Sequence, residues 1–409
     1  MSILIVILAL GFLMWAAYRG HSVILFSPIA ALLAVLLTNP IMVMPMFSGV
    51  FMVKMVDFIK LYFPVFMLGA IFGKVIELSG FSKSIVGAVI KIIGSKRAIF
   101  AIVMVCALLT YGGVSLFVVV FAVYPFAAEL FRAGNIPKRL IPGTIALGAF
   151  SFTMDALPGT PQIQNIIPST FFHTNTWSAP ILGIIGSIFI LTNGLWYLER
   201  CRKRAILNGE GYGTNLVNEP EDLEDKKLIN PIIAILPLIM VGICNLAFTK
   251  LIPIIYGKEF NLQISGNHIA VDISKLTAVW SVEAALIIGI LTVFIFAFKP
   301  VIKHFAHGSK TAVSGALLSS LNTASEYGFG AVIAAMPGFI VVTNALKSIP
   351  NPLVNEAVTV TTLAGITGSA SGGMSIALAA MANNFIQAAH AANIPLDVFH
   401  RIAAMASGG

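Results

Sequence analysis

Residues 98–131 read AIFAIVMVCALLTYGGVSLFVVVFAVYPFAAELF, an almost wholly apolar run broken once, by the small and polar residues 110–115 (TYGGVS). A helix that crosses a bilayer needs about 20 residues, so this run is too long for a single span. A second long apolar run, residues 356–392, is broken in the same way at residues 367–375 (TGSASGGMS). We predict that each run forms a re-entrant hairpin, in which two short helices enter the membrane from one face, meet at a tip and return.

The composition of the whole chain indicates that lipid is its main solvent. The 409 residues are 58% hydrophobic and only 10% charged, whereas a soluble domain carries about a quarter charged residues. The three cysteines include no CxxC pair, and the chain has no nucleotide-binding, hydrolase or metalloprotease motif. The net charge of +8 is typical of basic cytoplasmic loops. We therefore expect a helical membrane protein that is not an enzyme, with no cofactor, no metal and no nucleic-acid partner.

Hydropathy predicts about ten to twelve transmembrane segments, counted at about 20 residues each. The candidate spans are residues 3–18, 23–37, 61–78, 99–130, 141–171, 181–198, 229–248, 276–298, 325–345 and 357–392. Residues 398–409 begin a further apolar stretch that is too short to cross, so we expect the natural protein to continue beyond it. Residues 46–60 and 81–96 carry regularly spaced lysines and predict amphipathic helices at the membrane surface.

The basic residues of the loops predict the orientation of the chain. The longest polar stretch, residues 199–228, is rich in Lys and Arg, so we place it in the cytoplasm as a linker. Residues 299–310 should lie in a loop on the same side, and residues 250–275 on the other. The linker divides the chain into a first repeat, residues 1–198, and a second repeat, residues 229–409.

Three short motifs recur in the same order in both repeats. FGKVI at 72–76 resembles FGAVI at 329–333, GGVS at 112–115 resembles GGMS at 372–375, and NIP at 135–137 recurs at 393–395. In each pair the copies lie 257 to 260 residues apart. Under the predicted orientation the two repeats are inverted, a common arrangement in secondary transporters.

The two tips are the first candidate for a binding site. A helix that begins at a tip directs free N–H groups and the positive end of its dipole at a ligand, and a carboxylate is the natural guest. The alternative is that these small residues merely let helices pack closely; their recurrence in both hairpins favours the site. The candidate residues at the tips are Gly112, Gly113, Val114, Ser115, Ser369, Ser371, Gly372, Gly373 and Ser375.

A third candidate lies at residues 151–165 (SFTMDALPGTPQIQN), inside the apolar run 141–171. Two prolines and a glycine cannot continue a helix, so we predict an unwound segment within a span rather than an ordinary loop. Its open backbone and side chains are candidates to coordinate substrate or a coupling cation; these residues are Gly159, Thr160, Gln162 and Asn165.

Acidic residues inside spans are costly and therefore suggest a function. Asp155 lies at the predicted break, and Glu326 lies near the start of an apolar helix. Either is a candidate to carry a coupling proton. Other acids, Glu356 among them, lie nearer the predicted ends of spans, where we expect them to be solvated.

The chain resembles the gluconate permease (GntP) family of organic-anion:proton symporters along almost its whole length. The resemblance is carried by residues 15–24 (WAAYRGHSVI), the NIP motif after each hairpin and Gly159-Thr160-Pro161 in the break. At the first tip, where gluconate permeases carry a Glu, this chain has Gly-Gly-Val-Ser, so it is more similar to the hydroxy-acid members. The resemblance implies proton symport, homodimers and an elevator-type movement. It also implies that residues 398–409 enter a second unwound helix at Ser407-Gly408-Gly409.

Together these observations predict an all-α, multi-pass transporter in a bacterial inner membrane. It would carry a small organic monocarboxylate, such as gluconate or 3-hydroxybutyrate, with protons. Sodium coupling, an uncoupled channel or facilitator, and a structural membrane scaffold remain as alternatives.

Overall fold

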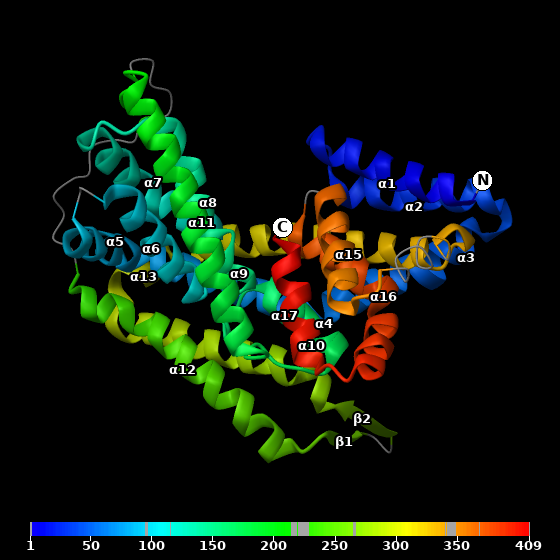
Figure 1. Cartoon of the computed structure of the whole chain (residues 1–409). Coiled ribbons are helices and arrows are strands. Elements are labelled where there is room, and N and C mark those ends of the chain that lie inside the picture. The colour runs from blue at the N-terminus through cyan, green and yellow to red at the C-terminus, as the bar shows by residue number, and fades with distance from the viewer. Residues whose placement is uncertain are drawn as a thin grey trace.

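A computed structural model describes residues 2–94, 97–114, 116–213, 219, 229–264, 267–339, 341, 349–367 and 369–408, and it is built almost entirely of helices (Figure 1). The helices of the first repeat are α1 (Ser2–Tyr18), α2 (Val23–Thr38), α3 (Val43–Met46), α4 (Met52–Leu78), α5 (Phe81–Ile93), α6 (Ala98–Tyr111), α7 (Leu116–Ala133), α8 (Ile141–Ala149), α9 (Phe152–Asp155), α10 (Ile163–Phe172) and α11 (Pro180–Leu207). The elements of the second repeat are α12 (Pro231–Tyr256), β1 (Glu259–Ile264), β2 (Asn267–Asp272), α13 (Ile273–Ala334), α15 (Pro352–Thr367), α16 (Ala370–Ala392) and α17 (Leu396–Ser407).

Within the described residues, four helical segments are by length and composition apolar enough to cross a bilayer: Pro40–Leu78, Pro180–Leu207, Pro231–Tyr256 and Ile273–Ala334. Large apolar side chains stand exposed on each of them, such as Met44, Phe189 on α11, Ile232 on α12 and Ile295 on α13. Contiguous exposed apolar surface of this kind is unfavourable in water and suits contact with lipid. The prediction of a helical membrane protein is confirmed.

Each long apolar run is divided where its sequence is interrupted. Helices α6 and α7 contact each other and are separated by the first tip, which follows Tyr111 and precedes Leu116. Helices α15 and α16 also contact each other across the second tip, between Thr367 and Ala370. The run 141–171 divides into α8, α9 and α10, and we call residues 156–162 the helix break.

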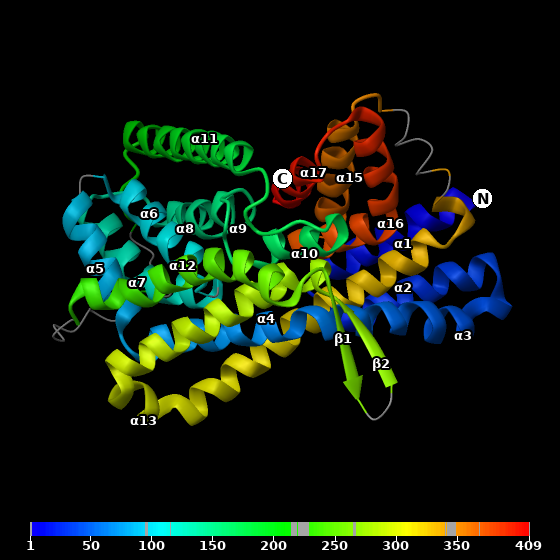
Figure 2. The same ribbon diagram turned by 90° about the horizontal axis from the view of Figure 1, so that it is seen from below.

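Helix α13 differs from its prediction, because the expected polar loop at residues 299–310 is helical. The range Ile273–Ala334 consists of two helices that meet at a sharp kink at Ala297, where φ is −137° and ψ is 39°, so the predicted span 276–298 ends close to where expected and the expected loop is instead the start of the second helix (Figure 2). Pro300 follows closely; a proline lacks the N–H for the helix hydrogen bond and its ring clashes with the preceding turn. The polar residues are accommodated because Val301 and Gly308 are buried while the lysines between and around them are exposed.

Helices α4 and α13 run alongside each other through the centre of the molecule (Figures 1 and 2). Residues 46–60, predicted to form a separate surface helix, instead lead continuously into α4 through the five-residue π-helix Phe47–Phe51. Phe51 and Phe58 are buried against the core. The apolar face of this segment therefore packs on the protein itself.

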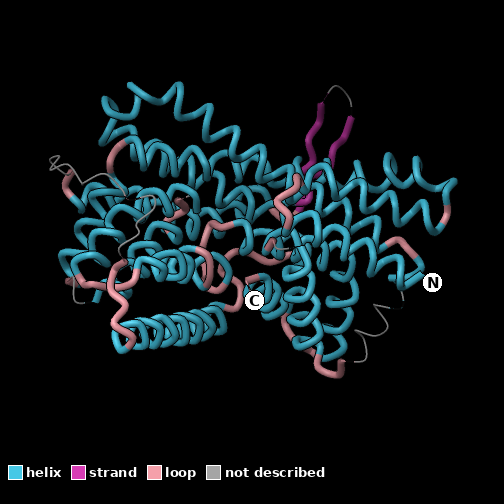
Figure 3. The backbone as a smooth tube through the Cα atoms, turned by 90° about the horizontal axis from the view of Figure 1, so that it is seen from above, coloured by secondary structure: helices cyan, strands magenta, loops and turns pink. Residues whose placement is uncertain are grey.

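The hairpin β1–β2 was not predicted. Its strands pair antiparallel from Glu259 opposite Asp272 to Ile264 opposite Asn267, and it projects from the helical body (Figure 3). The alternation of Phe260, Leu262 and Ile264 with polar residues is the period-two pattern of a strand, and it was available in the sequence.

Structure supports the internal repeat most directly at the two NIP motifs. Asn135 and Asn393 both have left-handed backbone, with φ of 48° and 54°. In both copies the next residue closes the helix: the Ile136 N–H donates to Phe131 O at 2.8 Å, and the Ile394 N–H donates to Ala389 O at 2.9 Å. Asparagine tolerates this conformation better than other non-glycine residues, so both hairpins end in the same cap.

The FGxVI motifs also match in the structure. In α4, Phe72, Gly73, Val75 and Ile76 are buried while Lys74 between them is partly exposed, and residues 329–333 of α13 show the same order of burial. This shared order of burial is what the predicted repeat requires of the two segments.

The glycine pairs of the tips match in sequence but differ in conformation. Gly113 lies in the turn of the first tip with a φ of +90°. Gly372 and Gly373 instead lie within the first turns of α16. The inverted relation of the two repeats remains a prediction.

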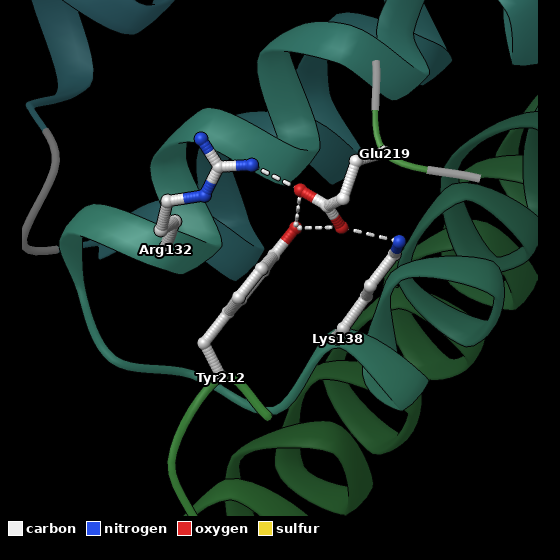
Figure 4. A network of polar contacts seen from close by, with 4 residues as sticks. All are labelled: Arg132, Lys138, Tyr212 and Glu219. Carbon is white, nitrogen blue, oxygen red and sulfur yellow. Dashed lines mark hydrogen bonds and ion pairs between the residues drawn. The ribbon is translucent and has the colours of Figure 1, made fainter. Parts of the chain in front are cut away.

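The loop after the first hairpin is joined to the linker by a polar network (Figure 4). Arg132 and Lys138 both form ion pairs with Glu219, and the Tyr212 hydroxyl donates to the same carboxylate at 3.2 Å. The hydrogen bond from Lys138, helped by those from Arg132 and Tyr212, holds the pKa of Glu219 below its ordinary value. The network fastens the linker to the end of α7.

Helices α8 and α6 approach each other closely at Gly148, so we expect a larger residue at this position to reduce stability. A Cβ on Gly148 would overlap the backbone carbonyl of Val103, whereas a Cβ on Gly143 would meet Leu198 at an ordinary 3.4 Å. We expect Gly148→Ala to destabilise the protein by about 1–3 kcal/mol through overpacking, and Gly143→Ala to be neutral or slightly stabilising. Thermal unfolding of both variants in detergent measures this, and equal melting temperatures would contradict it.

The Glu219 network predicts a pH dependence. Because its folded-state pKa is lowered, Glu219 contributes stability above the ordinary Glu pKa of about 4.3, and the contribution is lost as pH falls through the lowered value. Glu219→Gln should therefore lower the melting temperature at neutral pH and have no effect in strong acid. Glu199→Gln is the control, since Glu199 pairs with Arg202 within one helix. A pH-independent difference for Glu219→Gln would refute the assignment.

Candidate functional site

A cavity of about 480 Å³ lies between the two tips, the helix break and the pair α4–α13. The residues that line the cavity include Gly69, Lys74, Gly113, Gln162, Gln164 and Ser371. Gly113 comes from the first tip, Gln162 from the helix break and Ser371 from the first turn of α16. The structure thus brings the three predicted parts of the site to one space.

Three helices begin at this cavity. Its wall includes Val118 in the first turn of α7, Ile163 at the start of α10 and Ser371 at the start of α16. The first N–H groups of a helix have no partner within it, and the helix dipole is positive at that end. Three such ends around one space favour an anion there.

The polar side chains of the wall leave groups available to a ligand. Gln162 is held in place because its Nε2 donates to Thr110 O at 2.8 Å. Gln164 is 8% exposed, and its Oε1 has no hydrogen-bond partner among the described residues. Lys74, the one cation among the described lining residues, pairs with Glu77 at 2.7 Å. On the opposite wall, the hydroxyls of Thr323 and Ser371 lie 3.3 Å apart.

The second tip holds the carboxyl group of Glu326. Ser369 caps α16 by accepting the Gly372 N–H at 3.1 Å, and its hydroxyl also contacts Glu326. A Cβ on Gly372 would overlap the Glu326 Oε2 atom, so only glycine leaves room for this carboxyl group. Glu326 is 2% exposed, and its Oε2 has no hydrogen-bond partner among the described residues.

The helix break is supported by asparagine side chains. Gly159, with a φ of +79°, has its N–H bound to Thr176 O at 2.8 Å, and its carbonyl accepts from Asn245 Nδ2 at 2.9 Å. Asn165 Nδ2 donates to the carbonyls of Thr160 and Thr176, both at 2.9 Å. These contacts satisfy backbone groups that lipid could not satisfy.

Arg401 on α17 completes this support and was missed by the sequence analysis. It is fully buried, and its guanidinium donates to the carbonyls of Asp155 (3.1 Å), Thr176 (3.1 Å) and Ser178 (2.9 Å) and to Asn165 Oδ1 (2.8 Å). The neighbouring His400 bonds Thr174 through Nδ1 at 2.6 Å. The available signal in the sequence was a charged residue within the apolar stretch 398–409.

The two candidate proton carriers lie in different surroundings. Asp155 is 2% exposed at the end of α9, its Oδ1 has no partner among the described residues, and its Oδ2 lies against Gly408. Its backbone carbonyl accepts from Arg401, so a cation is close by. Glu326 instead lies at the second tip, one turn along α13 from the cavity residue Thr323.

The remaining predicted residues do not line the cavity. Gly112 packs on Leu238 of α12, Gly373 packs on the backbone of α15, Val114 is fully buried, and the Ser375 hydroxyl donates to Ser371 O at 2.7 Å. Ser115 falls outside the described residues. The roles of all these residues in binding remain predictions.

Glu356 corrects the expectation of a solvated acid. It is fully buried in α15, and neither carboxyl oxygen has a hydrogen-bond partner within the described part of the chain. Its position near the end of the helix does not bring it to the surface. Within the same residues, no three His, Cys, Asp or Glu side chains gather in a way that could hold a metal.

Comparison with known proteins supports a transport role. No protein-family model matches the chain. The protein described as uncharacterized transporter YxjC, from Bacillus subtilis (strain 168), is 55% identical over 420 residues, covering 100% of this chain and 89% of that protein. The crystal structure of the Alcanivorax borkumensis YdaH transporter, described as having an unusual topology, matches with a TM-score of 0.50 over 87% of this chain and 75% of that one.

The likeness to YdaH, at 15% identity, concerns the fold alone. The identity to YxjC extends over the whole chain and includes both hairpins and the helix break. The chain is a membrane transporter and belongs to the family of YxjC.

Proposed function

We propose that this transporter is a proton-coupled symporter of a small organic anion with one carboxylate. The observation that carries the proposal is the cavity at which α7, α10 and α16 all begin. Helix N-termini favour negative charge; Lys74 and Glu77, which also line the wall, pair with each other and add no net charge. The resemblance to the gluconate permease family supports the same class of substrate.

The size and lining of the cavity suit a small hydroxy acid. A volume of about 480 Å³ is within the range of small-molecule sites. Gln162, Gln164 and Thr323 supply polar groups that can bond hydroxyls beside the carboxylate. Gluconate and 3-hydroxybutyrate are the substrates proposed for testing.

Glu326 is proposed as the proton carrier, with Asp155 as the second candidate. Its carboxyl group lies at the start of α16, the helix whose first turn also reaches the cavity. An ionised Glu326 and a bound carboxylate would repel each other in surroundings where the buried Glu326 is poorly hydrated. Protonation of Glu326 removes this repulsion, so proton and anion favour each other's binding, which is the thermodynamic requirement for symport.

The movement is proposed to be of the elevator type. The two hairpins and the helix break would move together against α4 and α13, which form the facing wall of the cavity. We further propose two inverted repeats, a homodimer and a bacterial inner membrane, all of which the family resemblance implies.

Sodium coupling is the second candidate function. The hydroxyl oxygens of Thr110 and Thr160 are buried and have no hydrogen-bond partner among the described residues. Both adjoin an interrupted helix, where unwound backbone carbonyls coordinate sodium in other transporters. A sodium requirement for uptake would favour this candidate over proton coupling.

Uptake into proteoliposomes tests the coupling. We expect labelled 3-hydroxybutyrate or gluconate to accumulate under an inward proton gradient without sodium. Glu326→Gln should abolish gradient-driven accumulation and retain substrate exchange, because the variant binds anion without a proton. Asp155→Asn should retain coupling, and Glu129→Gln, at an exposed position on α7, is the control.

Accumulation that ignores the proton gradient in the wild type would refute proton coupling. If Glu326→Gln keeps full gradient-driven uptake and Asp155→Asn loses it, Asp155 is the proton carrier.

The Arg401 network predicts a structural cost. Lysine keeps the charge but cannot serve four acceptors in different directions, so buried carbonyls are left unpaired. We expect Arg401→Lys to destabilise the protein by roughly 3 kcal/mol, read as a lower melting temperature, with substrate affinity of the folded fraction unchanged within a factor of three. Arg200→Lys, exposed at the end of α11, is the control. Loss of affinity without loss of stability would place Arg401 in contact with substrate.

A further inference from the structure

We propose that the outward face of α11 binds an anionic phospholipid, with the acyl chains along its apolar part and the headgroup at its C-terminal end. The contacts to the headgroup phosphate come from Arg200, Lys203 and Arg204. No residue of α11 lines the cavity, so this surface is separate from the proposed substrate site.

Helix α11 packs on the rest of the protein by one narrow stripe. It lies at the edge of the helical body (Figure 2). Its buried residues fall on one side of the helix; they are Gly183, Ser187, Leu198 and Ala205. Gly194 lies on the same side, where a Cβ would overlap the Leu147 side chain of α8. The other side of α11 therefore has no protein against it among the described residues.

That outward face changes from apolar to cationic along its length. The exposed residues that share it, half a turn around the helix from the buried stripe, are Ile185, Phe189, Trp196, Arg200, Lys203 and Leu207. The aliphatic and aromatic residues come first, and the cations follow the tryptophan by one to two turns. A lipid molecule has the same order of apolar chain and charged headgroup.

The change falls where the lipid hydrocarbon should end. About 20 residues of helix rise about 30 Å, which is the thickness of the hydrocarbon core. Counted from Pro180, where α11 begins, this length ends near Arg200. Tryptophan and tyrosine are typical of the membrane–water interface, and Trp196 and Tyr197 are both exposed at this level. The cations therefore lie at the level of the lipid phosphates.

The cations at this end of α11 are not neutralised by neighbouring acids. The acidic residues nearest in the sequence pair elsewhere, Glu199 with Arg202 and Glu210 with Arg139. A cluster of basic residues directly after a spanning helix is typical of sites for anionic lipids. The exposed cations that form no ion pair within the described part of the chain are Arg200, Lys203 and Arg204.

Arg200 is held in an orientation that suits this contact. Its guanidinium lies over the Trp196 ring, 5.3 Å from the ring centre, where the aromatic face attracts a cation. The edge of a stacked guanidinium still presents N–H donors, and these match two oxygens of one phosphate. The ring that meets the acyl chains thus also positions the cation that meets the headgroup.

A second copy of the chain fits this face less well. Helices that associate within membranes bring small residues together, but Gly183 and Gly194 contact the protein itself and the outward residues are large. In a two-fold dimer with its axis perpendicular to the membrane, Arg200 would face Arg200 of the other copy. Like charges at that distance repel each other.

Lipid binding to the purified protein in detergent tests the proposal. The probes are phosphatidylglycerol and phosphatidylcholine with the same acyl chains, and native mass spectrometry measures how much of each binds. The wild type should prefer phosphatidylglycerol. One Lys or Arg near an anionic lipid contributes about fivefold in affinity. The triple variant Arg200→Gln, Lys203→Gln, Arg204→Gln should therefore bind phosphatidylglycerol roughly tenfold more weakly or worse, with phosphatidylcholine binding unchanged.

A second triple variant, Lys299→Gln, Lys303→Gln, Lys310→Gln, is the matched control. It removes the same charge from exposed positions of α13 that are predicted to lie on the same side of the membrane, and it should retain the preference for phosphatidylglycerol. Trp196→Ala should weaken phosphatidylglycerol binding by about threefold, because Arg200 loses the ring on which it stacks.

Equal losses in the two triple variants would reduce the effect to the general positive charge of that side and overturn the inference. Equal binding of the two lipids by the wild type would do the same. Inorganic phosphate should not displace the lipid, because it has no acyl chain; displacement would show a site for free anions instead. Light scattering should give the wild type and the α11 variant the same oligomeric state, and a difference would assign this face to a second copy.

Discussion

A helix can be interrupted inside a membrane only if other protein groups bind the backbone atoms that the interruption exposes. In this protein Asn165 and Asn245 bind carbonyls within residues 156–162, and Arg401 binds the carbonyls of Asp155 and Ser178 that flank them. The three side chains come from α10, α12 and α17, so segments distant in the sequence converge on one unwound stretch. The positions of α10 and of the cavity wall that it supplies depend on this convergence.

Arginine suits this role because its planar guanidinium has five donors directed to different sides. Here it binds carbonyls on both sides of the break as well as the Asn165 side chain. Arg401 belongs to the second repeat and the break to the first. The contact therefore joins α17 to the helix break beside the cavity, so the proposed movement of the break would have to include α17.

The sequence was sufficient to locate the helices and their interruptions, because lipid requires long apolar runs and each interruption needs glycine, serine or proline. It was insufficient where tertiary packing decides. Residues 299–310 look like a polar loop, yet they form the start of the second helix of α13, after the kink at Ala297, because Val301 and Gly308 bury one face of that helix. Glu356 lies near a helix end, yet packing encloses it. The arrangement of α4 against the tips decides which of the predicted polar residues line the cavity. No local sequence pattern encodes that arrangement.

The buried guanidinium of Arg401 also has an electrical consequence. A fixed positive charge lies at the helix break, and any displacement of the break along the membrane normal carries that charge through the transmembrane field. One elementary charge moved across the whole potential corresponds to about 2.3 kcal/mol per 100 mV. Whether Asp155 beside it is ionised decides whether the moving unit carries this charge or is neutral. Under the proposed elevator movement, the residue that binds the backbone beside the break would therefore make the energy of that movement depend on membrane voltage.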